Sequence, residues 1–214
     1  MDVHPPHKAI ESWRDFFIHL ITITIGLMIA LGLEGTVAWA HHRHLASEAR
    51  EGIRREIEDN RSALAEDKKA LFEDEQRMTK NITVLRQMRK TLVLPVKGEL
   101  VSTISWSSPT ESAWKTAHET GAVVYMGYKE VQSLDDIYLE QEIITNEVIR
   151  VFQEQPKVVS AFITHPDDEK LTSAEVELAL QRAEETLVEL KTLEQVVGQL
   201  YNMYSAQLSR YNTV

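Results

Sequence analysis

The chain has 214 residues, of which 43% are hydrophobic and 26% charged, and it carries a formal net charge of −10 and no cysteine. The lack of cysteine excludes disulfides, thiol catalysis and thiolate metal sites. The acidic balance, without a stripe of Lys and Arg, indicates that the chain does not bind nucleic acid, because phosphate contacts need clustered cations.

The charged residues are unevenly distributed along the chain. Residues 1–40 hold six of them, whereas residues 41–214 carry 21 Lys and Arg against 29 Asp and Glu. This distribution predicts three parts. They are a short N-terminal tail over residues 1–15, an apolar anchor over 16–40 and a water-soluble helical domain over 41–214.

The anchor has the length of a membrane span. Residues 16–33 contain no Asp, Glu, Lys or Arg, and a helix of this length extends about 27 Å, close to the roughly 30 Å hydrocarbon core of a bilayer. Trp13 and Trp39 flank the run, where indole rings favour the headgroup layer, so both are predicted interface anchors. We expect a single transmembrane helix embedded in a lipid bilayer.

Two other interpretations of the anchor remain open. Ala38-Trp39-Ala40 has the form of a signal-peptidase site, and the core helix of a soluble protein can be equally apolar. The run is longer than the roughly 7–15 apolar residues of a typical signal peptide, and no excess of positive charge precedes it. A permanent anchor is therefore the favoured interpretation.

Five residues of the anchor recur every fourth position and so lie on one stripe of the helix. They are Thr22, Gly26, Ala30, Glu34 and Ala38. Small residues on one stripe allow two membrane helices to approach closely, which predicts a helix-packing face. The alternative is that small residues are simply common in membrane helices and that Glu34 lies in water at the membrane edge, where a carboxylate is tolerated.

The distribution of Lys and Arg does not decide the orientation. Two precede the anchor, and four follow it by residue 55, which by the positive-inside rule favours a cytoplasmic domain. Long domains translocate largely regardless of charge, and a short tail before an anchor usually stays inside. We expect the inner membrane of a bacterium, with the soluble domain on the periplasmic side.

Residues 40–93 are predicted to continue the anchor as one long helix that stops at Pro95. Every seventh position is apolar: Ile57, Leu64, Leu71, Met78, Leu85 and Leu92, with satellites at Ile53, Phe72 and Ile82. The companion positions three residues later form a polar seam: Asn60, Asp67, Asp74 and Asn81. A dimeric coiled coil needs both positions apolar, so the pattern favours an intramolecular bundle.

Three further helices are predicted after a loop or short hairpin over residues 94–108. Ser108 and Glu111 resemble a capping box that opens a helix over 109–120, with a left-handed stop at Gly121. A third helix is expected over 128–155, ended by Pro156, and then a short apolar piece and a charged turn. Thr172 and Glu175 form a second capping box before a final helix of about 40 residues.

The expected fold class is therefore all-α. One N-terminal transmembrane helix continues into an extramembrane antiparallel bundle, whose first and last helices are long.

No arrangement of residues predicts catalysis. His41, His44 and Glu48 share a helix face and have the side chains of a zinc site, but seven residues of one straight helix do not converge easily on one ion. An interfacial, solvated patch is the favoured interpretation of these histidines. We find no phosphate-binding loop, dinucleotide fingerprint or calcium loop. We expect no catalytic, cofactor or metal site and no small-molecule substrate.

The junction between the anchor and the first long helix resembles a group of uncharacterised bacterial single-pass membrane proteins. The residues that carry this resemblance are FFIHLITITIGLMIALGLEG, HHRHLASEAREGIRREIEDNRSAL and ESAWKTAHETGAVVYM. They cover about half of the chain. The resemblance implies the single-pass topology and implies no activity.

These features predict a non-enzymatic protein that acts by contact. The favoured function is an accessory subunit of a larger integral-membrane complex, of the respiratory, photosynthetic or transport kind, with other membrane subunits as partners. Its anchor would dock on those subunits while the bundle braces them. The alternatives are a membrane-anchored ligand-sensing or signalling module that acts through a separate partner, and a homo-oligomeric envelope spacer.

Overall fold

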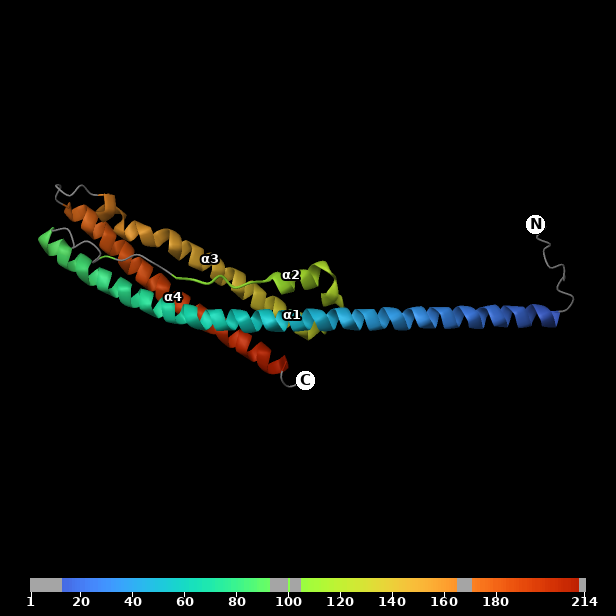
Figure 1. The fold of residues 1–214 in the computed structure, drawn as a ribbon. Helices are drawn as coiled ribbons and strands as arrows, with labels where there is room; N and C mark the ends of the chain where they lie inside the picture. The colour runs from blue at the N-terminus through green and yellow to red at the C-terminus, as the bar shows by residue number, and fades with distance from the viewer. Residues whose placement is uncertain (1–12, 93–99, 101–104, 165–170, 212–214) are drawn as a thin grey trace, which may run out of the picture.

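The computed structural model describes residues 13–92, 100, 105–164 and 171–211, and these residues form helices and no strand. The elements are α1 (Trp13–Thr91), α2 (Ser112–Glu119), the 3-10 helix η1 (Ala122–Tyr125), α3 (Tyr128–Thr164) and α4 (Ser173–Tyr211). The predicted all-α class is confirmed. Figure 1 shows α1, α3 and α4 side by side, with α2 at the end where α1 leaves the bundle.

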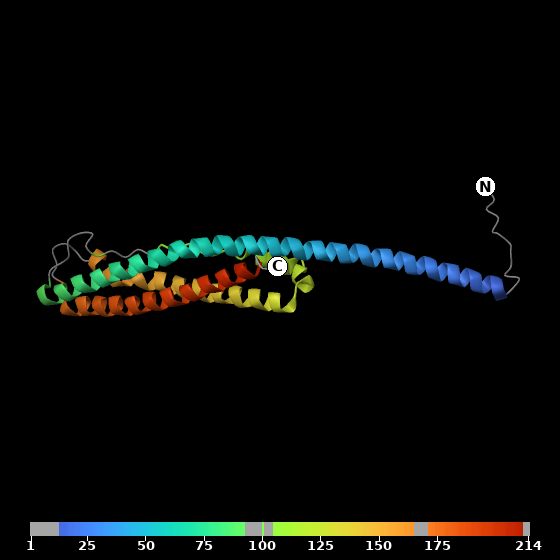
Figure 2. The ribbon, with the colours of Figure 1, turned by 90° about the horizontal axis from the view of Figure 1, so that it is seen from below.

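α1 is a single helix of 79 residues with two different environments. Its N-terminal part projects from the bundle and touches no other element, as both views show (Figures 1 and 2). Burial begins at Ala46 and continues to Met88. The helix ends with Leu92 in a left-handed conformation (φ 53°), and the Leu92 N–H donates to the Met88 carbonyl at 2.7 Å. The predicted stop at Pro95 lies outside the described residues.

The heptad pattern of α1 packs in the core of the bundle. Five of its apolar members are no more than 1% exposed: Ile57, Leu64, Leu71, Met78 and Leu85. Leu92 and the predicted satellite Phe72 are instead 38% and 54% exposed. Leu92 has left the helix, and Phe72 lies about 100° around the helix from Leu71, toward solvent.

The polar seam of α1 is also buried. Asn60, Asp67, Asp74 and Asn81 are each less than 5% exposed. The residues before α2 cross α1 at the first two of these positions, where Asn60 and Asp67 hydrogen-bond to Thr110 and Ser107.

α2 begins later than the sequence predicts, because its N-terminal cap comes from another helix. The predicted capping box at Ser108 is wrong: both Ser108 and Pro109 precede the helix, and Glu111 at the N-cap makes no side-chain cap hydrogen bond. Glu56 on α1 accepts from the free N–H groups of the first turn instead. The predicted left-handed stop at Gly121 is confirmed by its φ of 73°.

α3 runs through Pro156 to Thr164, so the predicted end at residue 155 is wrong. Proline in a helix interior removes one backbone hydrogen bond and disfavours the helix. The turn around it is nevertheless buried, since Gln155, Val158 and Val159 are at most 6% exposed. The apolar piece that follows Pro156 therefore belongs to α3, while the charged turn lies outside the described residues.

α4 agrees closely with its sequence prediction. The Glu175 N–H donates to Thr172 Oγ1 at 3.2 Å, and the Thr172 N–H donates to Glu175 Oε2 at 2.8 Å, which confirms the capping box. Five of the fully buried residues of α4 also recur every seventh position: Val176, Ala183, Leu190, Val197 and Tyr204. Leu200, three residues after Val197, is fully buried as well. α4 runs antiparallel to α1 and packs against both α1 and α3.

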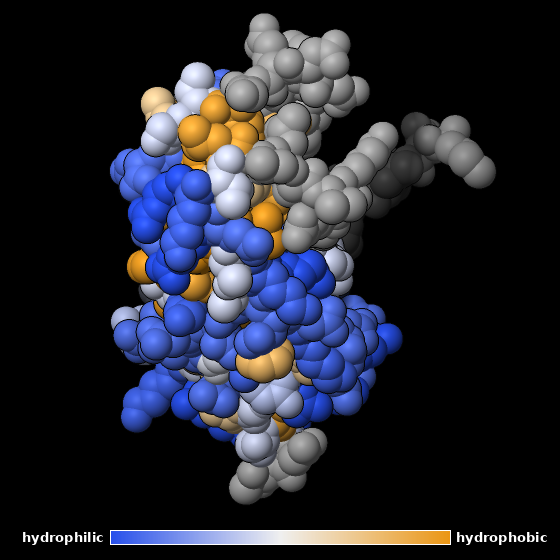
Figure 3. Space-filling model, turned by 90° about the vertical axis from the view of Figure 1, so that its left-hand side faces the viewer, coloured by the Kyte–Doolittle hydropathy of each residue, from blue (hydrophilic) through white to orange (hydrophobic). Residues whose placement is uncertain are grey.

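The end of the bundle farthest from the N-terminus is largely hydrophilic on its visible face (Figure 3). Apolar side chains appear there only as patches among polar ones. The longest run of exposed large apolar side chains lies on the projecting part of α1.

Candidate functional site

The projecting part of α1 is the first candidate site. Among the described residues, α1 alone is long and apolar enough to cross a membrane, by length and composition, and its most apolar window is entirely unburied. Large side chains such as Ile23 and Met28 are 69% and 68% exposed. Water disfavours so much contiguous apolar surface, which indicates that lipid or another protein covers it.

The five residues of the predicted packing stripe all lie on this exposed surface: Thr22, Gly26, Ala30, Glu34 and Ala38. The Thr22 hydroxyl donates to the Ile18 carbonyl at 2.8 Å, so its polar group is satisfied within the helix. A Cβ added at Gly26 would meet no atom within 4 Å. The same is true at Gly32 and Gly35, so no other part of the described chain approaches this segment on any of these sides.

The predicted interface anchors lie at the two ends of this segment. Trp13 and Trp39 are 79% and 62% exposed. The guanidinium of Arg43 lies over the Trp39 ring, 5.4 Å from its centroid, in a cation–π contact.

The histidines beyond Trp39 contact different partners. His44 Nε2 is 3.3 Å from Glu48 Oε1 on the exposed face, whereas the His42 ring stacks on Tyr125 with centroids 3.9 Å apart. In the parts of the chain that the structure describes, no three His, Asp or Glu side chains are grouped to hold a metal ion. The His42–Tyr125 stack joins η1 to α1, which periodicity in the sequence could not indicate.

A buried carboxylate joins three helices at this end of the bundle. Glu56 Oε2 accepts from the Ala113 N–H at 2.8 Å and from Ser112 Oγ at 3.0 Å, and Glu56 Oε1 accepts from the Tyr138 hydroxyl at 2.7 Å. The Trp114 ring stacks on Tyr138, with centroids 5.1 Å apart. Burial and the hydrogen bond to Glu56 raise the pKa of Tyr138 far above its usual range.

A second buried group ties the residues before α2 to the bundle. Asn60 Nδ2 donates to the Thr110 carbonyl at 2.7 Å, and the Thr110 N–H donates to Asn60 Oδ1 at 2.9 Å. Gln141 Nε2 donates to the same carbonyl at 3.1 Å, and the Tyr204 hydroxyl donates to Gln141 Oε1 at 2.6 Å. The network thus connects α1, α3, α4 and Thr110.

The carboxylates farther along α1 are less well satisfied. Asp67 Oδ1 accepts from the Ser107 N–H at 3.0 Å, but its Oδ2 has no hydrogen-bond partner among the described residues. Burial raises the pKa of Asp67. Burial, and then the nearby Glu194, likewise raise the pKa of Glu75.

We expect Asp67→Asn to stabilise the bundle at pH 7 by about 1 kcal/mol, the scale of one poorly satisfied buried polar group. The pKa of Asp67 is higher in the folded than in the unfolded chain, so folding takes up a proton at pH values between the two. The stability of the bundle therefore falls as pH rises through this window. The gain should therefore disappear near pH 4. Thermal unfolding in detergent micelles at both pH values measures it.

Asp59→Asn is the matched control, because Asp59 is exposed on the same helix. If Asp67→Asn is no more stable than this control at pH 7, or keeps its advantage at pH 4, burial of the Asp67 charge does not limit stability.

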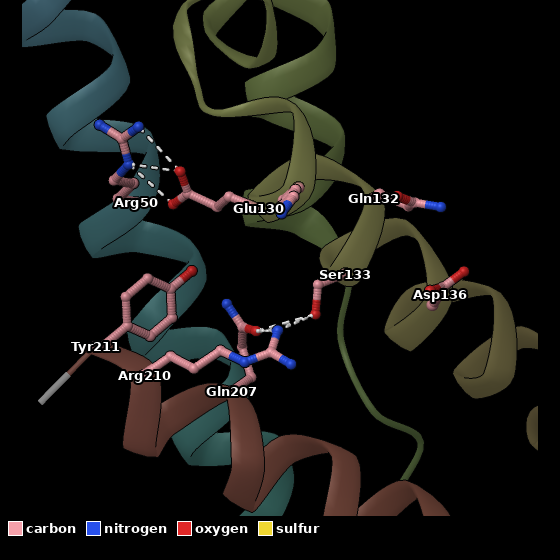
Figure 4. A pocket seen from close by; sticks show the side chains of 9 residues that line it. Arg50, Glu130, Gln132, Ser133, Asp136, Gln207, Arg210 and Tyr211 are labelled. Carbon is pink, nitrogen blue, oxygen red and sulfur yellow. Dashed lines mark hydrogen bonds and ion pairs between the residues drawn. The ribbon is translucent and has the colours of Figure 1, made fainter. Parts of the chain in front are cut away.

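A cavity of about 910 Å³ lies where the start of α3 and the end of α4 meet the middle of α1 (Figure 4). On one side, Arg50 Nε and Nη2 donate to the carboxylate of Glu130 at 2.8 and 2.9 Å, and this hydrogen bond raises the pKa of Arg50. On the other, Arg210 Nη1 donates to Ser133 Oγ at 2.6 Å and Gln207 Oε1 at 3.2 Å.

The sequence does not indicate this cavity, because its lining comes from three distant segments: Arg50, Lys129, Glu130, Gln132, Ser133, Asp136, Gln207, Arg210 and Tyr211. None of these segments has a motif that marks a binding site.

No protein-family model, curated protein or solved structure matches this chain. The resemblance to bacterial single-pass proteins therefore gains no support from a family model, and function rests on the geometry described above.

Proposed function

We propose that this chain is a single-pass membrane protein of the bacterial inner membrane that serves as a non-enzymatic accessory subunit of a larger integral-membrane complex. Residues 16–40 cross the bilayer, and the bundle lies on the periplasmic side. The partners are other integral membrane subunits, which contact the stripe from Thr22 to Ala38.

The observation that carries this proposal is the continuity of α1. One helix of 79 residues supplies both the exposed apolar segment and a core helix of the bundle. An unbroken helix is stiff, so a partner bound to residues 16–40 would fix the distance and direction of the bundle relative to that partner. A protein with this shape is suited to bracing neighbours.

The native mass and composition of the protein after gentle detergent extraction from its own membranes test this function. A large particle with a constant set of other polypeptides is the expected result. A monomer or a small homo-oligomer would exclude the subunit role.

We expect Gly26→Leu and Ala30→Leu to reduce co-purification with those polypeptides, since each adds a bulky side chain where close helix contact is proposed. The unfolding midpoint of the bundle should not change, because a side chain at Gly26 meets no atom of the bundle. Quantitative co-purification from membranes measures the effect.

Gly32→Leu is the matched control, because Gly32 also has nothing within 4 Å and faces away from the stripe. A packing face at Thr22–Ala38 would be contradicted if Gly26→Leu and Gly32→Leu reduced co-purification equally. It would also be contradicted if neither Gly26→Leu nor Ala30→Leu reduced co-purification.

The cavity beside Arg50 supports a second candidate function, a ligand-sensing or signalling module. A ligand there would contact Arg50 on α1 and Arg210 on α4. It could thereby shift α1 relative to α4 and change the position of the membrane segment. A monomer in the native-mass experiment would favour this function, with a separate partner carrying the signal.

A further inference from the structure

Three large side chains lie in solvent at the turn between α2 and α3. Val124, Tyr125 and Tyr128 are 76%, 44% and 82% exposed. Figures 1 and 2 both place this turn at the end of the bundle nearest the projecting part of α1. Packing of the bundle does not account for these side chains, because the core of the turn is formed by Ala122 and Met126 instead.

The stack between Tyr125 and His42 fixes the level of this turn along α1. His42 follows Trp39 by three residues, which corresponds to about 4.5 Å along the helix axis. The exposed side chains of the turn therefore lie close to the level of Trp39, the predicted interface anchor.

That level coincides with the headgroup layer if residues 16–40 span a bilayer. A hydrocarbon core of roughly 30 Å takes about 20 residues of helix, and the headgroups add about 5–7 Å on each side. Counted from Phe16 along an untilted helix, Trp39 lies within this layer, and His42, which sets the level of the turn, lies about 2–4 Å beyond it. The average tilt of membrane helices, about 20°, is enough to lower one side of the bundle into it.

The chemistry of the turn fits the same layer. Tyrosine combines an apolar ring with a polar tip and is enriched at membrane–water interfaces. Two exposed cations lie near this level: Lys129 follows Tyr128 in the chain, and Arg43 covers Trp39 on α1. Cations at this level attract anionic headgroups.

We propose that the turn carrying Val124, Tyr125 and Tyr128 docks on the headgroup layer of the lipid bilayer and holds the bundle at a fixed tilt to the membrane. This inference rests on the proposed membrane span of residues 16–40. The bundle then has two contacts with the membrane, one through α1 and one through this turn.

Single cysteines test the proposal cleanly, because the chain has none of its own. Each of three single-cysteine variants of the full chain carries one nitroxide label at an exposed position: Ile25→Cys, Val124→Cys or Val188→Cys. The labelled proteins are placed in nanodiscs of phosphatidylcholine and phosphatidylglycerol. Collision rates with oxygen, which partitions into lipid, and with a water-soluble nickel chelate give the depth of each label. The expected oxygen-to-nickel ratio is highest at residue 25, lowest at 188 and intermediate at 124.

Each other outcome has a distinct meaning. A ratio at residue 124 equal to that at 188, with a high ratio at 25, would overturn the docking of the turn and leave the membrane span intact. Low ratios at both 25 and 124 would overturn the span as well. Low collision rates of both reagents at 124 would show a protein contact there instead of lipid.

A variant provides an independent check. Tyr128→Ser leaves the stack of Tyr125 on His42 intact and should lower the ratio at label 124 toward that at 188, while the ratio at label 25 stays unchanged. An unchanged ratio at 124 would mean that Tyr128 does not hold the turn at the membrane.

Discussion

Replacing Glu56 by alanine should destabilise the bundle by about 3–5 kcal/mol, the largest effect that we expect from one polar substitution. Glu56 is 7% exposed and accepts hydrogen bonds from the start of α2 and from the Tyr138 hydroxyl. Alanine leaves these donors buried without an acceptor and removes the negative charge that favours a helix N-terminus. Urea unfolding in detergent micelles, followed by tryptophan fluorescence, measures the loss.

Two further variants make this result specific. Glu56→Gln keeps one carbonyl oxygen as an acceptor and should cost about 1–2 kcal/mol. Glu58→Ala removes an exposed glutamate that pairs with Arg54 on the same helix, and should cost less than about 0.5 kcal/mol. If Glu56→Ala is no more harmful than Glu58→Ala, the capping of α2 by α1 is wrong.

Asn60→Leu should cost about 2–3 kcal/mol, because it removes both reciprocal hydrogen bonds to the Thr110 backbone. Leucine fills a similar volume, so the loss reflects hydrogen bonding more than a cavity. We expect the residues before α2 to detach first. Hydrogen exchange followed by mass spectrometry should show faster exchange over residues 105–112 than in the unmodified chain.

Asn202→Leu is the matched control, since Asn202 is an exposed asparagine on α4. It should leave both stability and the exchange of residues 105–112 unchanged. Exchange over 105–112 that is equally slow in Asn60→Leu would show that Asn60 does not hold this segment on the bundle.

The seam residue Asn60 also shows where sequence reasoning reached its limit. Its heptad position and polarity were visible, and they led to a prediction of an intramolecular bundle. Its partner was not visible, because Thr110 lies 50 residues away in a segment that the sequence assigns to a helix of its own. The same holds for Glu56, which lies 82 residues from its partner Tyr138.

Pro156 illustrates a different limit. The helix-breaking property of proline is local, and it predicted an end of α3 at residue 155 that is wrong, because α3 continues through Pro156. Burial of Val158 and Val159 in the next turn offsets the lost backbone hydrogen bond. That offset depends on the neighbouring helices, about which the local sequence carries no information.

The sequence by itself determined the helical class, the long apolar N-terminal segment, the core-facing heptad of α1, and the capping box and approximate length of α4. Each of these depends on residues a few positions apart on one helix, where periodicity and hydrogen bonding are local. Only the tertiary structure decided how Glu56 caps α2, how Asn60 holds Thr110, and that Tyr125 stacks on His42 at the level of Trp39. These contacts join segments 50 or more residues apart, and packing of the whole bundle brings them together.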